Sequence, residues 1–312
     1  ESKWAYARES SYKRALRDIL AKETHFKTKA HSLQKHILKH FSQEKIYHQF
    51  AEAVYGAELP PKISIEDLPK ISLLTSVYKA EEHIEQLLED VTEQTIFAQK
   101  CEWIILNVNE AGNDVEEKAI LKYVDRFPEN IIYKRLDEDP GVYGVWNKGL
   151  ELASGEFITN VNCDDRRRTD AFEQQAMLLY TSPGIDLVYN DSYMSTQPNM
   201  RWNDIHPEAT QRYNFEEFST GALLRGNLPH NNPMWKKSLH DRYGLFDEKY
   251  RSAGDWEFWL RCATQGAQFR KHYDVLGVYY FNPQGISTNF ENFSWKQEEE
   301  KEVYMKYHEN VA

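Results

Sequence analysis

The sequence has few cysteines and no long apolar run, and these absences exclude several classes of protein. The three cysteines, Cys101, Cys163 and Cys262, are too few and too scattered for a disulfide framework or a zinc site. No stretch approaches the roughly 20 apolar residues that a membrane-spanning helix needs, and no secretory signal is visible. We therefore expect a cytoplasmic protein without a transmembrane segment, for which peripheral association with the inner face of a membrane stays open.

Basic residues are also in deficit. Lys and Arg together number 38 against 49 Asp and Glu, which gives a formal net charge of −11. A chain of this charge is not expected to bind nucleic acid in bulk, because the phosphate backbone repels it.

The remaining composition is that of an ordinary globular protein, with 41% hydrophobic and 28% charged residues. A length of 312 residues suits two domains, or one large α/β domain with an appendage. Aromatic residues reach 13%, which is compatible with surfaces that stack on sugars, although we expect most of them to pack in the core.

Residues 1–58 are expected to form a helical extension. Leu33, Ile37 and Phe41 recur every four residues and give one apolar stripe. Ser42 suits the start of a further helix and Gly56 its end. The face of that helix expected to be buried consists of Ile46, Tyr47, Phe50, Ala53 and Val54. Such a stripe is too small to be a domain core, so it must pack on the rest of the chain, on another copy or on a further domain.

Residues 59–68, with the pair Pro60-Pro61, are predicted to be a linker, and residues 69–312 to form one domain that ends in a helix. Strand and helix patterns alternate after the linker, which predicts a mostly parallel sheet with helices on both faces. The expected strands are 71–77, 103–108, 131–136, 157–161, 186–189 and 275–281. The expected helices are 80–92, 115–126, 142–153, 170–180, 255–265 and 295–308.

The segment Asn162–Asp165 places two adjacent carboxylates directly after a short apolar strand. Open α/β sheets bind ligands at the carboxyl ends of their strands, and paired carboxylates suit a hard divalent cation that can in turn hold a diphosphate. An Asp-Asp pair can equally cap a helix or a turn, so the motif needs support from other segments.

The order of four segments provides that support. They are Thr75–Glu82, Asn109–Asp114, Asp139–Gly149 and Asn162–Asp165, and together they resemble the family 2 glycosyltransferases of the GT-A fold. The resemblance covers about residues 69–290 and implies a Rossmann-like α/β domain that transfers a sugar with inversion from a nucleotide-diphosphate sugar to a hydroxyl of a glycan or other acceptor.

The resemblance also implies roles for individual residues. Asp165 is expected to bind a divalent cation directly, Mn²⁺ or Mg²⁺, with Asp164 toward the cation or the ribose. Asn109 stands where the family usually has an aspartate against the nucleotide base, which weakens the inference of a UDP-sugar. The residues expected to contact the donor nucleotide are Thr75, Ser76, Val77, Tyr78, Asn109, Glu110, Asn147 and Asp164. The alternative for Asn109–Asp114 is a plain polar turn.

A second acidic segment, Ser252–Arg261, is similar to a helix start of the family, with Gly254 in place of the first acid. The resemblance implies that Asp255 is the catalytic base, which takes the proton of the acceptor hydroxyl; the position also suits a helix N-cap. His230, Trp256 and Arg166 are candidates for the acceptor or diphosphate side. The alternatives are a structural His230, a core Trp256 and a loop cluster of arginines that offsets the acids.

Two other functions remain open. A nucleotidyltransferase that makes nucleotide-sugars would have a similar sheet, but no Gly-rich phosphate loop follows the first strand. A non-catalytic helical scaffold would rest on residues 1–58 and the tail. The segment His36–Ile46 resembles the closing helices of a GT-B glycosyltransferase domain, which implies a fused transferase domain upstream; the alternative is a helical appendage that braces the sheet.

Overall fold

The computed structural model describes residues 9–41, 43–55, 63–110, 112, 115–208 and 210–311. The chain divides into two compact units, Glu1–Ile63 and Ser64–Ala312. The division falls inside the segment expected to be a linker, and each unit is described here by itself.

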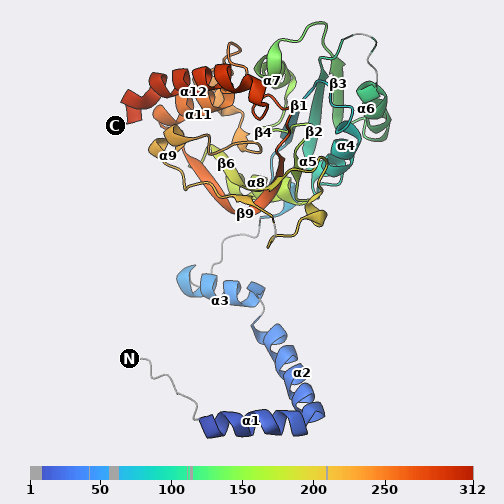
Figure 1. Cartoon of the computed structure of the whole chain (residues 1–312), viewed down its shortest axis with the longest axis vertical. Coiled ribbons are helices and arrows are strands. Elements are labelled where there is room, and N and C mark those ends of the chain that lie inside the picture. The colour runs from blue at the N-terminus through green and yellow to red at the C-terminus, as the bar shows by residue number, and fades with distance from the viewer. Residues whose placement is uncertain are drawn as a thin grey trace. The chain divides into compact units, whose positions relative to one another are not determined.

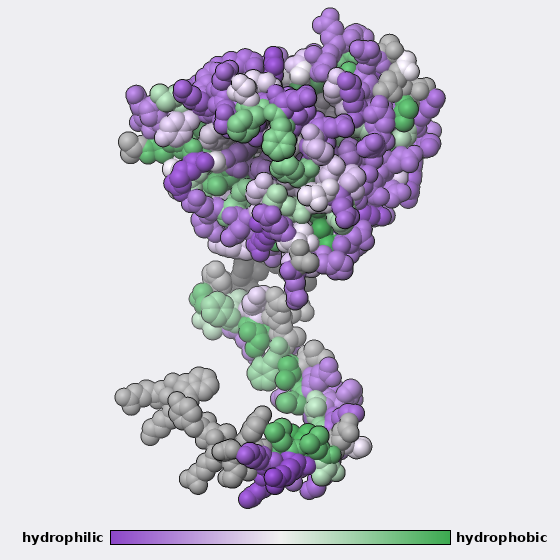
Figure 2. Space-filling view, in the orientation of Figure 1, coloured by the Kyte–Doolittle hydropathy of each residue, from purple (hydrophilic) through white to green (hydrophobic). Residues whose placement is uncertain are grey.

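The first unit consists of the helices α1 (Glu9–Ala21), α2 (Glu23–His40) and α3 (Gln43–Tyr55) (Figure 1). No described side chain of these helices is buried, and Figure 2 displays apolar side chains at their surface. Nothing within the unit covers the face of α3 that was expected to be buried, so its packing on the rest of the chain, on another copy or on a further domain stays a prediction. The exposed positions are Ile46, Tyr47, Phe50, Ala53 and Val54. Ser42 and Gly56, the predicted helix start and stop, lie outside the described residues.

The second unit is built on a nine-stranded sheet of order β3-β2-β1-β4-β8-β6-β9-β5, in which β7 pairs with β6. The strands β3, β2, β1 and β4 are parallel, as are β6 and β9, whereas β8 runs antiparallel to both of its neighbours. The bounds are β1 (Ile71–Val77), β2 (Cys101–Asn107), β3 (Ile131–Arg135), β4 (Phe157–Asn160), β5 (Arg166–Arg167), β6 (Leu187–Ser195), β7 (Arg212–Tyr213), β8 (Met234–Lys236) and β9 (Phe269–Tyr280). The expected α/β fold is confirmed, and the reversed β8 is an addition to it.

Helices cover both faces of this sheet. Along β1, Leu73 and Val77 enter one apolar cluster and Leu74 enters the other, because neighbouring strand residues point to opposite faces. The bounds are α4 (Ile84–Thr92), α5 (Phe97–Lys100), α6 (Val115–Arg126), α7 (Gly141–Leu152), α8 (Ala171–Tyr180), α9 (Thr220–Arg225), α10 (Ser238–Tyr243), α11 (Gly254–Thr264) and α12 (Phe293–Tyr307), with short 3-10 turns at Ile65–Asp67, Trp202–Asp204, Phe290–Asn292 and His308–Val311. Residues of α4, α5, α6 and α8 belong to one cluster, and residues of α7, α9, α10, α11 and α12 to the other.

The strand directions decide which loops share an edge. Because β1, β2 and β4 are parallel neighbours, the loops that follow Val77, Asn107 and Asn160 emerge at one edge. The antiparallel β8 pairs Met234 with Thr159, so the residues that precede β8 reach this same edge. Loops from both halves of the sheet therefore meet where β4 ends.

Candidate active site

The paired carboxylates lie at the shared edge, directly after β4. Asp165 is buried; its Oδ2 accepts from Asn162 Nδ2 at 3.0 Å and its Oδ1 from the backbone N–H of Tyr280 at 3.1 Å. Asp164 is half-buried, and its Oδ2 accepts from Asn282 Nδ2 at 2.9 Å. Burial and the adjacent Asp164 charge raise the pKa of Asp165. The loop thus concentrates negative charge in a place from which water is largely excluded.

Arg166 turns away from these carboxylates into the protein. Its Nε pairs with Asp90 Oδ2 at 3.1 Å, and its other nitrogens donate to the backbone oxygens of Cys163, Asp165 and His83 and to Asn199 Oδ1. The guanidinium is buried, and its bonds to the backbone oxygens of Cys163 and Asp165 hold the acidic loop in place. A diphosphate contact by Arg166 would have to replace some of these bonds.

The other two arginines of the run are also engaged by protein groups. Arg167 donates to the backbone oxygen of Asn160 at 2.5 Å and to Gln175 Oε1 at 3.2 Å. Arg168 pairs with Asp170 at 2.5 Å and Asp274 at 3.1 Å. Within the described residues, neither Asp164 nor Asp165 has a cationic side chain within ion-pair distance.

The loop after β1 differs in exposure from residue to residue. Thr75 is 1% exposed, and its hydroxyl donates to the backbone oxygen of Val161 at 2.8 Å while it accepts from Trp103 Nε1. Val77 is buried in the core, Ser76 is half-buried and Tyr78 is 51% exposed. Four of the predicted donor contacts lie in this segment, and of these only Ser76 and Tyr78 have side chains that are partly or fully exposed.

Asn109 fastens the loops after β1 and β2 to each other. Its Oδ1 accepts from the backbone N–H of Lys79 at 2.8 Å, and its Nδ2 donates to Glu116 Oε1 at 2.8 Å. Glu110 is exposed and its backbone oxygen accepts from Arg135 at 3.1 Å. The sequence analysis did not single out Glu116, which is fully buried on the first turn of α6; an acid in a first helical turn signals a helix start and nothing more specific.

Asn147 lies on α7 with its amide directed to the segment before α11. Its Nδ2 donates to the backbone oxygen of Phe246 and to Glu248 Oε1, both at 2.9 Å, and its Oδ1 accepts from the backbone N–H of Phe246 at 3.1 Å. Both amide hydrogens are used within the protein. A role in donor binding would require one of these bonds to break.

Asp255 lies at the start of α11 between two neutral donors. Its Oδ1 accepts from the Tyr143 hydroxyl at 3.0 Å and its Oδ2 from Asn227 Nδ2 at 2.7 Å. Burial raises the pKa of Asp255, and the bonds from Asn227, the Trp256 backbone and Tyr143 oppose that rise. The carboxylate is thus positioned on both oxygens.

One short loop reaches both acidic regions. Asn227 contacts Asp255, and its Oδ1 accepts from the backbone N–H of His230 at 3.4 Å. Further along the loop, the backbone oxygen of Asn231 accepts from Asn160 Nδ2 at 3.1 Å, and Asn231 lines a water-sized cavity of about 10 Å³ together with Asp165. The loop 227–232 therefore connects the region of Asp255 to that of Asp165.

An open hollow of about 320 Å³ adjoins this loop. His230 lines it, with a left-handed backbone (φ 48°) and a ring packed among Tyr213, Phe215 and Tyr279 at centroid distances of 5.1, 5.3 and 4.8 Å. Burial lowers the pKa of His230. The lining residues are Asn214, Phe215, Glu216, Ala222, Arg225, Gly226, Asn227, Leu228 and His230.

Trp256 and Trp259 both belong to the core. Trp256 is 9% exposed and its Nε1 donates to the backbone oxygen of Leu223 at 2.7 Å; Trp259 is 1% exposed. The predicted contact of Trp256 with the acceptor stays a prediction, and the burial of its side chain favours the alternative of a core residue.

Comparison with known proteins decides the family. The model of "Glycosyl transferase family 2" matches residues 72–244. The chain belongs to this family. It is 26% identical over 197 residues to the PGL/p-HBAD biosynthesis glycosyltransferase of Mycobacterium bovis, a match that covers 62% of this chain and 72% of that protein. An uncharacterized glycosyltransferase of Bacillus subtilis, YwdF, is 25% identical over 195 residues, covering 62% of this chain and 68% of the relative.

Solved structures agree on the fold of this family 2 glycosyltransferase. S. aureus TarS in complex with UDP superposes with a TM-score of 0.55 at 17% identity, over 75% of this chain and 65% of the TarS chain. The mannosyltransferase PcManGT from Pyrobaculum calidifontis, in complex with GDP-Man and Mn²⁺, has a TM-score of 0.53 at 17% identity, over 80% and 67% of the two chains. The chain therefore spans about two thirds of the length of these structures.

Family membership favours the transferase hypothesis over the nucleotidyltransferase and scaffold hypotheses.

Among the residues that the structure describes, no helix combines the length and apolar character that crossing a membrane requires.

Proposed function

We propose that this family 2 glycosyltransferase moves a sugar from a nucleotide-diphosphate sugar to a hydroxyl of a carbohydrate acceptor, with inversion at the anomeric carbon. The observation that supports it most is the loop 227–232, which contacts Asp255 through Asn227 and lies beside Asp165 through Asn231. Asn227 and His230 of the same loop also line the open hollow.

The donor nucleotide is proposed to lie over the loops that follow β1, β2 and β4. Ser76 and Tyr78 offer accessible side chains there, while Thr75, Val77 and Asn109 shape the loops from within. A UDP-sugar is favoured because TarS structures contain UDP and UDP-GlcNAc, and PcManGT with GDP-Man gives the alternative. Glu110 and Asp164 complete the proposed donor contacts, whereas Asn147 and Arg166 contribute by bracing the protein around them.

A divalent cation, Mn²⁺ or Mg²⁺, fits Asp165 and Asp164. Two adjacent carboxylates without an ion-pair partner among the described residues are a suitable oxygen donor set, and Mg²⁺ in particular is often held by one or two carboxylates plus substrate phosphates. No group of three or more His, Cys, Asp or Glu that could hold a metal occurs among the described residues, so the donor diphosphate would supply further ligands. When bound, the cation neutralises charge that develops on the leaving diphosphate.

Asp255 is the proposed base. The acceptor oxygen forms a bond to the anomeric carbon as the bond from that carbon to the diphosphate oxygen breaks, and the acceptor proton passes to the Asp255 carboxylate. The nucleoside diphosphate leaves with the electron pair of the broken bond. A carboxylate within hydrogen-bond reach of the hydroxyl is sufficient for this transfer.

The acceptor is proposed to enter the hollow beside Asn227 and His230. Phe215 offers an apolar ring, and Glu216 and Arg225, which pair with each other at 2.5 Å and are about 60% exposed, offer charged groups at its rim. An aromatic ring flanked by polar side chains suits a saccharide, which has apolar C–H faces and hydroxyl edges.

A thermal-shift screen tests the proposal. UDP-sugars and GDP-mannose are added with Mn²⁺ or Mg²⁺, and a true donor is expected to raise the melting temperature because it binds only the folded chain. At a hundredfold excess over Kd, such binding adds about 2.7 kcal/mol to the free energy of unfolding. The variant Asp165→Ala should lose the part of the shift that needs the cation. If no nucleotide-sugar stabilises the wild-type protein with either cation, the proposed donor class is wrong.

A further inference from the structure

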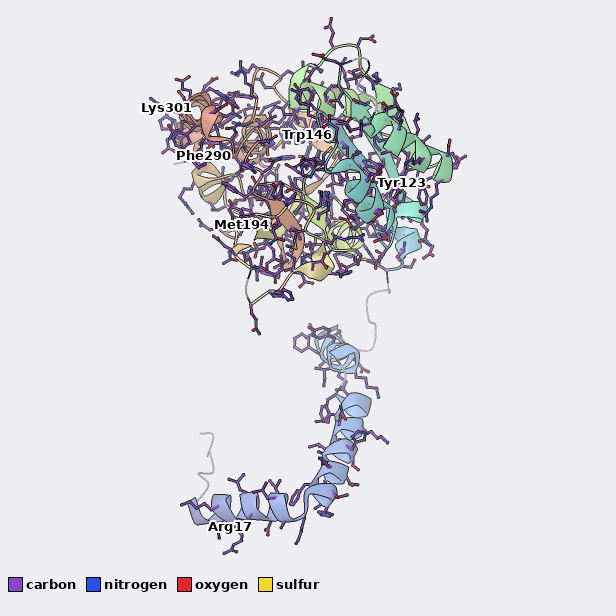
Figure 3. The ribbon with its side chains drawn as sticks, turned by 45° about the vertical axis from the view of Figure 1, so that its right-hand side comes forward. Arg17, Tyr123, Trp146, Met194, Phe290 and Lys301 are labelled. Carbon is purple, nitrogen blue, oxygen red and sulfur yellow. The ribbon has the colours of Figure 1, made fainter. Side chains whose placement is uncertain are left out.

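The surroundings of Asp255 carry an inference that rests on the proposed function and deepens it. Tyr143 is 3% exposed in the first turn of α7. Its ring meets that of Trp146, labelled in Figure 3, edge-on at a centroid distance of 5.5 Å, and that of Phe246 in a tilted arrangement at 5.9 Å. The hydroxyl of this fixed ring donates to Asp255 Oδ1. A phenol held by packing has little freedom to choose another acceptor.

Gly254 makes this contact possible. A Cβ atom at Gly254 would lie 2.7 Å from Cδ2 and Cε2 of Tyr143 and 3.0 Å from its Cζ, closer than any side chain tolerates. The Tyr143 ring therefore occupies the space of a side chain at position 254. The acid that the family usually has there would collide with the ring, so glycine and tyrosine form a matched pair.

The second oxygen of Asp255 is held from the opposite element. Asn227 Nδ2 donates to Oδ2 at 2.7 Å, and Asn227 also lines the hollow proposed for the acceptor. A rigid helix thus fixes one carboxylate oxygen and the acceptor loop fixes the other. A carboxylate has about four lone-pair sites, and these two side-chain bonds occupy two of them.

We propose that Tyr143 and Asn227 are positioning residues that hold one Asp255 oxygen each in the direction of the acceptor hydroxyl, and that Gly254 is required because the Tyr143 ring fills its side-chain space. Both groups donate to the ionised carboxylate, so they favour the form that can act as a base. Their loss would leave the buried carboxylate with a higher pKa and a less defined direction.

Other titratable groups surround the start of α11 without bonding to Asp255. Glu299 of α12 accepts from the backbone N–H groups of Arg251, Ser252 and Ala253, and Glu257 of α11 is paired with Arg261 and Lys306. On the loop side, Arg225 and His230 line the hollow with Asn227. The Tyr143 and Asn227 variants leave the bonds of Glu299 and Glu257 in place, so a changed titration of Asp255 in those variants reports the two donors.

The chain contains a matched control. Tyr307 of α12 donates to Glu257 Oε1 at 2.6 Å, which is another buried tyrosine–carboxylate bond, two positions along the same helix. Tyr307→Phe removes an equivalent bond that lies outside the proposed site. If Tyr143→Phe and Tyr307→Phe lower the melting temperature by the same amount, each variant has lost only its hydroxyl bond and both rings remain packed.

The test is a titration of the full chain labelled with ¹³C at the aspartate carboxyl carbons, in which Asp255→Asn identifies the Asp255 signal. In Tyr143→Phe and in Asn227→Ala the midpoint of that signal is expected to move to higher pH, while Tyr307→Phe leaves it in place. Gly254→Ala, which displaces the ring, should move it in the same direction. An unchanged midpoint in Tyr143→Phe and Asn227→Ala would overturn the inference, and this result does not depend on any substrate.

Kinetics add the readout of function, with the nucleotide-sugar that stabilises the protein and water or an oligosaccharide as acceptor. Tyr143→Phe is expected to lower kcat about tenfold, to leave the donor KM unchanged and to move the acid limb of the rate profile to higher pH, since a bond to a charged group is worth about 1.5 kcal/mol or more. Tyr307→Phe should keep the wild-type profile. If Asp255→Asn retains full transfer, the proposed base fails, whereas a dead Asp255→Asn with an unaltered Tyr143→Phe profile refutes only the positioning role.

Discussion

At the scale of single residues, the two acids of the site are surrounded by different partners. Asp255 is held by neutral donors on both oxygens, whereas Asp165 lies beside a second carboxylate at the sheet edge. The first arrangement suits a base that must stay directed at a hydroxyl. The second suits the binding of positive charge.

We expect Asp255→Asn to keep donor binding and to lose transfer by a factor on the order of 10² to 10⁴, the usual contribution of a positioned base. The amide keeps the shape of the side chain but cannot take the acceptor proton. Donor binding is followed by thermal shift and transfer by release of the nucleoside diphosphate. Transfer at the wild-type rate would contradict the assignment.

The complementary change, Asp165→Ala, should weaken donor binding in the presence of Mn²⁺ and leave the weak binding seen without metal. Removal of one carboxylate halves the local charge that attracts the cation. Calorimetric titration of the donor with and without EDTA measures the difference. Asp274→Ala, which removes an exposed partner of Arg168, is the control and should behave as wild type.

At the scale of elements, a buried carboxylate joins β1, β2 and the turn before β4. Glu102 accepts from Ser72 Oγ at 2.5 Å, from Ser154 N and Oγ at 2.5 and 2.7 Å, and from Gly155 N at 3.1 Å, and pairs with Lys70 at 2.6 Å. Burial raises the pKa of Glu102, but the bonds from Lys70, Ser72 and Ser154 outweigh it and lower the pKa to about 2. The network holds the start of β4, whose end carries the acidic loop.

Glu102→Gln is therefore expected to lower the free energy of unfolding by about 3 kcal/mol at neutral pH. Because the folded-state pKa of Glu102 lies below its ordinary value of 4.5, this stabilisation is complete above that pH and is lost as the pH falls toward 2. Urea unfolding at several pH values measures the free energy of unfolding. The difference in this free energy between wild type and variant should become smaller as the pH falls. Glu300→Gln, in a half-exposed pair with Lys296, is the control.

Elements with strong patterns could be predicted from the sequence; among the short ones β3 and β4 were predicted, whereas several others were not. The strand Ile71–Val77 and the helix Val115–Arg126 have the predicted bounds, because both carry long apolar patterns. The strand β9 begins at Phe269, before the predicted residue 275. Its first half could not be predicted because residues 270–274 are mostly polar. The elements β5, β7, β8, α9 and α10 span six residues or fewer, too few for a periodic signal.

The residues of the candidate site also fall into some that could be predicted from the sequence and some that could not. Asp164, Asp165 and Asp255 stand in motifs that resemble a family, so their positions could be predicted. Tyr143 and Asn227 could not, because they contact Asp255 from 112 and 28 residues away in the sequence and only the packing of α7 and the loop before β8 brings them together.

At the scale of the whole molecule, the core lies entirely in the second unit. No described residue before Leu68 is buried, and both apolar clusters begin at or after that residue. Nothing within the first unit covers the apolar side chains of α2 and α3, and a fused transferase domain or peripheral membrane contact stays a prediction.

We expect a chain that starts at Ser64 to keep the melting temperature and the donor binding of the longer chain, since both apolar clusters lie within the second unit. Calorimetry and the thermal-shift screen compare the two. A large fall in melting temperature would mean that the helices stabilise the sheet directly.

The reversed direction of β8 fixes the length of the chain that leads into it. Met234 is registered opposite Thr159, so each residue inserted between Asn227 and Met234 would displace Asn227 by up to about 3.5 Å, more than the length of its bond to Asp255. Insertions at the exposed residues 206–208 leave that spacing untouched. The chain that leads into β8 therefore cannot change in length, whether by evolution or by loop grafting, without moving Asn227 away from Asp255.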